Sequence, residues 1–177
     1  SSDLEIYNEK GFASFVPVYN GKSLDKVNLN VPGDHNISNA LSAIALCLEM
    51  GISYDHIKAG LAKFGGAHRR FELKGTFNGA TVVDDYAHHP TEIKASLSAA
   101  ANYPHNRVVV CFQPHTYTRT LSFLDDFAEA LSAADVVLLA DIYAAREPDV
   151  YGVSSKDIAD RIEKLGTEVH YLGSFES

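Results

Sequence analysis

Residues 80–90 read Ala80-Thr81-Val82-Val83-Asp84-Asp85-Tyr86-Ala87-His88-His89-Pro90. The first four are small or β-branched and predict a buried strand. Pro90 suits the first position of a helix, and residues 91–97 have helical spacing. The stretch therefore predicts a strand, a polar loop and a helix. Two acids, a phenol and two imidazoles follow the strand at its carboxyl end, where open α/β sheets bind ligands.

The loop after this strand has a structural interpretation beside the functional one. An aspartate at the end of a strand also caps helices, and adjacent histidines are common at protein surfaces. Both interpretations stay open on spacing alone. The eight histidines and two cysteines do not show the spacings usual for zinc ligands, so we predict no metal site.

Composition narrows the class of protein. The chain has 177 residues and a formal net charge of -8, which does not favour binding to nucleic acid. No apolar run reaches the roughly eighteen residues of a membrane helix. Cys47 and Cys111 lie in apolar patterns, as expected of buried thiols in a reducing compartment. We expect a cytoplasmic protein that binds neither nucleic acid nor membrane.

The first part of the chain predicts a small antiparallel meander followed by two helices. Short apolar or alternating runs lie at residues 3–8, 12–19 and 27–31, with turns expected at Glu9-Lys10-Gly11 and Asn20-Gly21. One helix is predicted up to Gly51, and a second from Ser53 to Phe64. Gly65-Gly66 follows and marks the best candidate for a domain boundary. The single methionine, Met50, lies within a helix, so we expect the chain to be a piece of a longer protein.

From Phe71 onward strands alternate with helices. A hairpin is predicted over 71–77 and 80–84, strands at 107–112, 136–140 and 168–171, and helices at 91–102, about 121–133 and about 155–165. This order predicts an α/β fold with a mainly parallel sheet. The loop of residues 84–90 is here named the acidic loop. Loops 113–119 and 141–148 are then expected at the same sheet edge as the acidic loop. No glycine-rich dinucleotide fingerprint follows these strands, which argues against a nicotinamide cofactor.

Two further groups of polar residues suit a nucleotide. Asn36 and Asn39 are three apart near a helix start, and paired amides can read the edge of a base; alternatively, Asp34 or Asn36 merely caps the helix. Arg69 and Arg70 enter a strand pattern, so at most one of them is expected to point into a given site. A guanidinium suits phosphate because its planar fork donates two parallel bonds, but a solvated basic pair at a hinge is the alternative.

The motifs resemble the ATP-dependent Mur ligases of peptidoglycan synthesis. They are Gly33-Asp34-His35-Asn36-Ile37-Ser38-Asn39-Ala40, Arg69-Arg70-Phe71-Glu72, and the acidic loop continued through Thr91 and Glu92. Loops 112–120 and 143–147 narrow the resemblance to members that join L-alanine to UDP-N-acetylmuramate. The resemblance covers almost the whole chain but only the later part of such an enzyme.

The resemblance implies two domains. Residues 1–68 would be the C-terminal part of a central ATP-binding domain. Residues 69–177 would be a Rossmann-like C-terminal domain, truncated at its end because no covering helix follows the last predicted strand. The UDP-binding domain and the phosphate loop would belong to the missing N-terminal portion of the same enzyme, so the chain alone is expected to be inactive.

The family's chemistry and site residues follow from the same resemblance. MgATP converts the muramyl carboxylate to an acyl phosphate, and the amine of L-alanine attacks it to form an amide. The resemblance implies a nucleotide site made of His35, Asn36, Asn39, Arg70 and Asp85, with the amides on adenine, Arg70 on phosphate and Asp85 on ribose. It implies a substrate site made of Tyr86, His88, His115 and Arg119.

The resemblance leaves some assignments empty and some alternatives open. It gives no catalytic residue and no metal ligand within this chain, and the Mg²⁺ ligands are expected mainly outside it. Thr116 departs from the arginine of some relatives, and Arg146 has no assigned role. A murein tripeptide ligase of similar fold and a nonenzymatic nucleotide-binding module remain alternatives.

Overall fold

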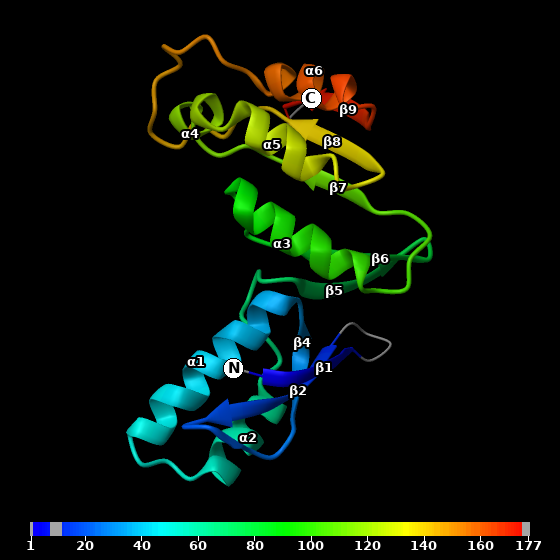
Figure 1. Cartoon of the computed structure of the whole chain (residues 1–177). Helices are drawn as coiled ribbons and strands as arrows, with labels where there is room; N and C mark the ends of the chain where they lie inside the picture. Colours follow the sequence, from blue (N-terminus) through cyan, green and yellow to red (C-terminus); the bar gives the residue numbers. More distant parts are fainter. Residues whose placement is uncertain (1, 8–11, 175–177) are drawn as a thin grey trace. The chain divides into compact units, whose positions relative to one another are not determined.

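The computed structural model describes residues 2–7 and 12–174 and divides into two compact units (Figure 1). The first unit comprises the described residues up to Tyr86 together with Ser98–Pro104, and the second comprises Ala87–Leu97 and the described residues from His105 onward. Each unit has its own cluster of buried apolar side chains. The domain boundary predicted after residue 68 stays a prediction.

The first unit opens with the predicted antiparallel meander. Strand β2 (Phe12–Tyr19) pairs antiparallel with β1 (Ser2–Tyr7), β3 (Lys22–Ser23) and β4 (Val27–Pro32). Asn20 and Gly21 have φ angles of 49° and 76°, as the predicted two-residue hairpin turn requires. The other predicted turn, at 9–11, lies outside the described residues.

Two helices complete the core of this unit. They are α1 (Asp34–Glu49) and α2 (Tyr54–Lys63), close to the predicted bounds. Phe15 and Val27 of the sheet are fully buried, with Ile37 and Ile44 of α1 and Ile57 of α2 packed in the same cluster. The start of α1 is thereby fixed to the end of β4, which positions the asparagines discussed below.

The hairpin of β5 (Glu72–Phe77) and β6 (Ala80–Asp84) corrects two predictions. Residues 80–83 were expected to be buried, yet Val82 and Val83 are 42% and 37% exposed, because this two-stranded ribbon belongs to neither core cluster. The strand also begins at Glu72, so Arg69 and Arg70 do not alternate along it. They lie in a turn, in which the Arg70 N–H donates to the Ala67 carbonyl over 3.1 Å.

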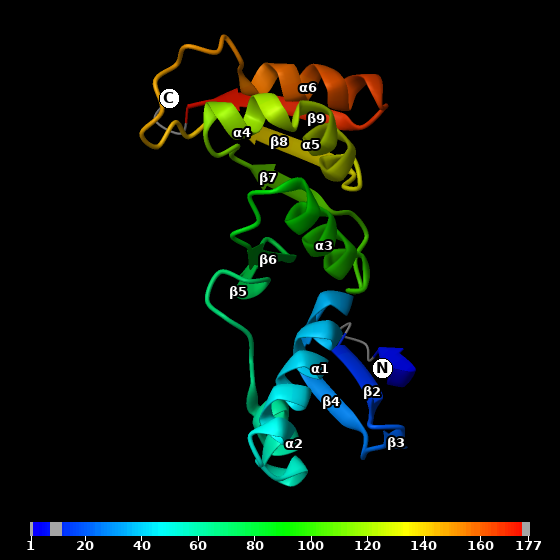
Figure 2. The ribbon, with the colours of Figure 1, turned by 60° about the vertical axis from the view of Figure 1, so that its left-hand side comes forward.

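The second unit confirms the α/β class with a parallel sheet. The strands β7 (Val109–Phe112), β8 (Val136–Ala140) and β9 (Glu168–Gly173) pair in parallel, in sequence order. Between them run α4 (Tyr117–Ser122), α5 (Leu124–Leu131) and α6 (Ser155–Lys164), and α3 (Pro90–Ala101) precedes them. Figure 2 shows α5 and α6 lying along this sheet, and their buried residues share one core with β8.

Two details of this unit differ from expectation. The helix predicted over 121–133 is two helices, because Phe123 between them has a φ of −128°, and its ring packs 4.8 Å from the His89 ring and 6.5 Å from the Phe127 ring. Cys111, expected to be buried, is exposed on β7, the end strand of the three-stranded sheet, whereas Cys47 is half-buried.

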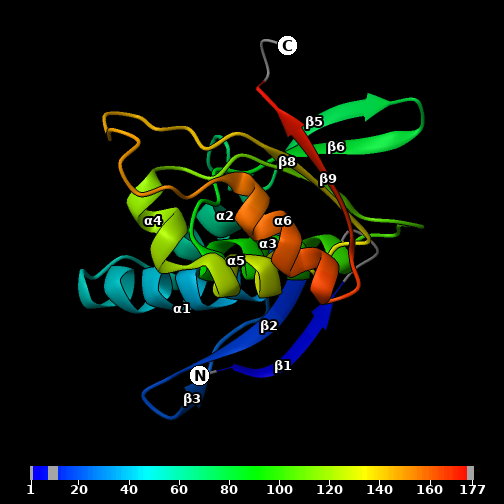
Figure 3. The ribbon, with the colours of Figure 1, turned by 90° about the horizontal axis from the view of Figure 1, so that it is seen from above.

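In the part of the chain that is described, no helix is long and apolar enough to cross a membrane. Figure 3 gives the view from above.

Candidate functional site

A pocket of about 400 Å³ lies beside the start of α1 within the first unit. Its lining is apolar except for two amides, and consists of Leu29, Val31, Asn36, Asn39, Ala40, Ala43, Gly60, Leu61 and Phe64. Small-molecule sites are commonly clefts of this size, with apolar walls and a few polar groups that set orientation. The pocket includes the predicted pair Asn36 and Asn39 but not His35, Arg70 or Asp85.

The two asparagine side chains in this pocket are linked to each other. Asn36 donates from Nδ2 to the Pro32 carbonyl over 2.7 Å, and Asn39 donates from Nδ2 to Asn36 Oδ1 over 3.2 Å. The N-cap of α1 is Gly33, so neither Asp34 nor Asn36 occupies the N-cap position. Oriented amides beside the half-exposed Phe64 ring suit a flat aromatic ligand that presents donors and acceptors at its edge.

His35 lies at the same helix start and constrains its neighbour. Gly33 has a φ of +92°, and a Cβ there would lie 2.6 Å from His35 Cε1. The φ angle is what requires glycine here, since other residues rarely adopt it, whereas the imidazole could turn away from an added Cβ. His35 itself is exposed.

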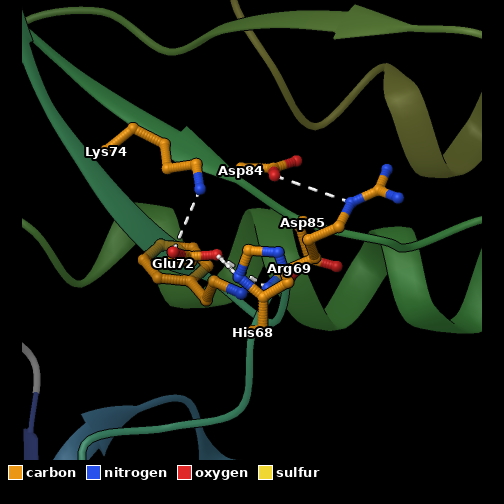
Figure 4. A network of polar contacts seen from close by, with 7 residues as sticks. His68, Arg69, Glu72, Lys74, Asp84 and Asp85 are labelled. Carbon is orange, nitrogen blue, oxygen red and sulfur yellow. Dashed lines mark hydrogen bonds and ion pairs between the residues drawn. The ribbon is translucent and has the colours of Figure 1, made fainter.

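Residues 68–72 form the second candidate group, here named the arginine turn (Figure 4). Arg69 and Phe71 have φ angles of 54° and 48°, so two left-handed residues flank Arg70. Such residues persist only where surrounding contacts hold them, and they concentrate at functional sites. Two bonds to the acidic loop do this here: the Tyr86 N–H donates to the Arg69 carbonyl and the Phe71 N–H to Asp85 Oδ2, both over 2.8 Å.

Side chains reinforce the arginine turn. Arg69 Nε lies 3.6 Å from Asp84 Oδ2, and its guanidinium lies 4.6 Å from the centre of the Tyr86 ring. Glu72 accepts from the Arg69 N–H over 2.8 Å, which with the Lys74 ammonium holds the pKa of the Glu72 carboxyl below its usual value. The turn is thus held on both sides of the exposed Arg70, whose guanidinium is suited to phosphate.

The third group, here named the histidine cluster, comprises His88, His115, Arg119 and Tyr143 in the second unit. The ring centre of His115 lies 6.3 Å from that of His88 and 5.4 Å from that of Tyr143. Arg119, one helical turn further on, has Nη1 3.4 Å from His115 Nδ1 and 3.5 Å from the His115 carbonyl oxygen. His115 and Tyr143 follow β7 and β8, whose parallel pairing brings their carboxyl ends to one edge of the sheet.

The adjacent histidines of the acidic loop have different surroundings. His88 is held by Glu92, whose Oε2 accepts from the His88 N–H over 3.0 Å and lies 3.4 Å from His88 Nδ1. His89 packs edge-on against Phe123, and its Nδ1 accepts from the Thr91 N–H over 3.3 Å. His89 therefore has a structural role, packed against Phe123, whereas His88 belongs to the histidine cluster.

Bonds between two loops fix the start of α4, which carries Arg119. The Thr116 N–H donates to the Tyr143 carbonyl over 2.9 Å, and the Thr118 N–H donates to Glu147 Oε2 over the same distance. The Thr118 hydroxyl also donates to Glu147 Oε1. The hydroxyl and N–H of Thr118 hold the pKa of the Glu147 carboxyl below its usual value.

Comparison with known proteins gives the family of this chain. The family model described as "Mur ligase, glutamate ligase domain" matches residues 69–177, which is more than half of the chain. The chain belongs to the Mur ligase family. Among curated Mur ligases, the UDP-N-acetylmuramate–L-alanine ligase of Agathobacter rectalis is 59% identical over 170 residues, or 96% of this chain. That of Clostridium acetobutylicum is 56% identical over 170 residues, also 96% of this chain.

Solved Mur ligases agree in fold. The UDP-N-acetylmuramate–alanine ligase of Thermotoga maritima superposes with a TM-score of 0.81 at 31% identity, covering 98% of this chain and 37% of that one. A murein peptide ligase of Psychrobacter arcticus has a TM-score of 0.65 at 27% identity, covering 99% of this chain and 36% of that one. The chain likewise spans 37% of the length of each of the two curated relatives.

The predicted site residues thus fall into three groups of one Mur ligase chain. The structure brings Asn36 together with Asn39, Asp85 and Tyr86 with the arginine turn, and His88 with His115 and Arg119. Their roles toward ligands stay predictions. Within the described ranges, no group of three His, Cys, Asp or Glu side chains could hold a metal ion.

Three residues that belong to these groups or support them were not predicted from the sequence. Glu92 lies four positions after His88 in the first turn of α3, and this short separation could have indicated that its carboxylate reaches back to His88. Tyr143 and Glu147 had no comparable signal, because their contacts depend on how two separate loops fold together.

Proposed function

We propose that this chain is the later part of an ATP-dependent ligase that joins L-alanine to the carboxylate of UDP-N-acetylmuramate in peptidoglycan synthesis, in the cytoplasm. The observation that carries the proposal is the histidine cluster, assembled in a chain 59% identical to a curated ligase of that name. A guanidinium beside two imidazoles can bind a small amino acid through its carboxylate, since the Arg fork donates charge-assisted bonds.

In this proposal the cluster receives the amino acid. Arg119 binds the L-alanine carboxylate, and His115 and His88 line its amino side, with Glu92 holding His88 in place. Tyr86, from the preceding part of the acidic loop, completes the predicted substrate set. The amine must reach the reacting carbonyl as a neutral nucleophile, and an imidazole nitrogen beside it can accept the proton that it loses.

The first unit supplies the nucleotide contacts in this proposal. Asn36 and Asn39 bind the adenine edge in the pocket of about 400 Å³, with His35 at the same helix start. Arg70 binds phosphate from the arginine turn, and Asp85 binds the ribose hydroxyls. Bound MgATP would supply the phosphoryl group that activates the muramyl carboxylate as an acyl phosphate. The proposal places no Mg²⁺ ligand among these residues.

Two alternatives compete with this assignment. A murein tripeptide ligase has a similar fold, but the solved example has a lower TM-score and identity than the alanine ligase. A nonenzymatic nucleotide-binding module would use the asparagine pocket without the histidine cluster. The cluster favours an enzyme with a second, amino-acid substrate.

The test is a ligation assay on the longer protein that carries these residues. Phosphate release and amide product are measured with ATP, UDP-N-acetylmuramate and a panel of L-alanine, glycine, L-serine and a murein tripeptide. The proposal expects the highest kcat/KM with L-alanine, and no product from the 177-residue chain alone. A preference for the tripeptide supports the first alternative, and nucleotide binding without product supports the second.

A further inference from the structure

The loop after β8 reaches the start of α4 through Glu147. Both oxygens of its carboxylate accept from Thr118: Oε2 from the N–H over 2.9 Å and Oε1 from the hydroxyl. Thr118 is the second residue of α4 and directly precedes Arg119. The Glu147 side chain therefore accepts from both donors of a residue in the first turn of α4.

The backbone around these bonds adopts conformations that need support. Thr116 has a φ of 68°, which is rare for a β-branched residue, and Ala145 has a φ of 55°. The Thr116 N–H donates to the Tyr143 carbonyl, and the Glu147 N–H donates to the Ala144 carbonyl over 3.0 Å. Left-handed residues of this kind persist only when neighbouring contacts hold them. The two loops thus hold each other in a conformation that neither favours alone.

Glu147 does not belong to the groups proposed to bind substrate, but it bonds Thr118, which is next to one of them in sequence. Thr118 lies between His115 and Arg119 in sequence, and these two are joined by the contact of Arg119 Nη1 with His115 Nδ1 at 3.4 Å. Moving the first turn of α4 would move that contact. Carboxylate acceptors form charge-assisted bonds, which are stronger than those between neutral groups.

We infer that Glu147 is a positioning residue for the amino-acid site, which holds the first turn of α4 and so sets where His115 and Arg119 lie. The inference rests on the proposed function, since it concerns the binding of L-alanine. Glu147 itself is not assigned a contact with the substrate.

The experiment measures KM and kcat for all three substrates in the longer protein. Glu147→Ala is expected to raise the KM for L-alanine at least about tenfold, because it removes two charge-assisted bonds. Thr118→Val, which keeps the N–H bond, should give a smaller rise, and Thr118→Ser, which keeps both donors, should recover most of the wild-type KM. Glu163→Ala, at an exposed glutamate of α6, is the matched control and should change nothing.

A double variant separates positioning from general damage. If Glu147 acts through Thr118, then Glu147→Ala with Thr118→Val should be no worse than Glu147→Ala alone, because the shared bonds are already lost. The KM values for ATP and the muramyl nucleotide should stay within about twofold. Hydrogen exchange at residues 116–120 should speed up in Glu147→Ala, which reports the loosened turn without reference to activity.

The outcomes distinguish this inference from the proposed function. A wild-type protein that makes no L-alanine product overturns both. Wild-type ligation with an unchanged L-alanine KM in Glu147→Ala overturns the inference alone, as does an equal rise in all three KM values. If Glu147→Ala does not fold, an unchanged KM in Thr118→Val is sufficient to overturn it.

Discussion

The acidic loop divides between the two units, and its two halves are held in different ways. In the first half, the contacts all run to the arginine turn: Asp85 accepts from the Phe71 N–H, and Tyr86 donates from its own N–H to the Arg69 carbonyl. In the second half, each histidine has a separate partner, because Glu92 contacts His88 and Phe123 packs against His89. The first half therefore behaves as part of a turn, whereas each residue of the second can be changed by itself.

The two aspartates test the first half and carry the largest expected effect. Asp85→Asn in the longer enzyme should weaken ATP dependence roughly tenfold to a hundredfold, because it removes the charge proposed to bind the ribose. Asp84→Asn removes only a partly exposed ion pair with Arg69 at 3.6 Å, and should lower stability by about 0.2–1 kcal/mol without changing the KM for ATP. KM for ATP and the melting temperature are measured for both.

An equal loss of ATP dependence in both aspartate variants, or a loss in Asp84→Asn alone, would assign the wrong carboxylate to the nucleotide. The pair is well matched because both residues are half-buried neighbours with the same charge. A change in melting temperature common to both would show only that the arginine turn had loosened.

The two histidines test the second half and carry a smaller effect. His88→Ala should raise the KM for L-alanine about tenfold with little change in melting temperature, because His88 belongs to the proposed substrate site. His89→Ala should lower the stability by about 1 kcal/mol, since it loses the edge-on contact with Phe123, and leave that KM unchanged. Thermal unfolding and steady-state kinetics check both. A raised KM in His89→Ala with none in His88→Ala would reverse the assignment.

Much of the fold could be predicted because its signals are local. The asparagine–glycine turns, the order of strands and helices, and the parallel pairing of the last three strands all follow from short patterns. The break between α4 and α5 at Phe123 could not be predicted from the local pattern. The Phe123 ring there packs against His89, which is distant in sequence, and against Phe127. The exposure of Val82 was missed for a similar reason, since strand propensity does not say whether a strand will be covered.

In the candidate site too, contacts between residues close in sequence could be predicted, and contacts between distant residues could not. His115 and Arg119 could be placed together because they are four apart and follow a predicted strand. The contact of Glu147 with Thr118 joins residues 29 positions apart, and no periodicity relates them. The bond from the Phe71 N–H to the Asp85 carboxylate could not be predicted either. The sequence does not show whether a carboxylate binds a ligand or accepts from the main chain of a turn.

The central claim is that the arginine turn serves ATP and the histidine cluster serves the amino acid. It is tested most directly by Arg70→Lys and Arg119→Lys in the longer enzyme, since lysine keeps the charge but loses the guanidinium fork. We predict about a tenfold rise in the KM for ATP in Arg70→Lys alone, and a similar rise in the KM for L-alanine in Arg119→Lys alone. Both KM values rising together in either variant, or the two rises exchanged, would contradict the account.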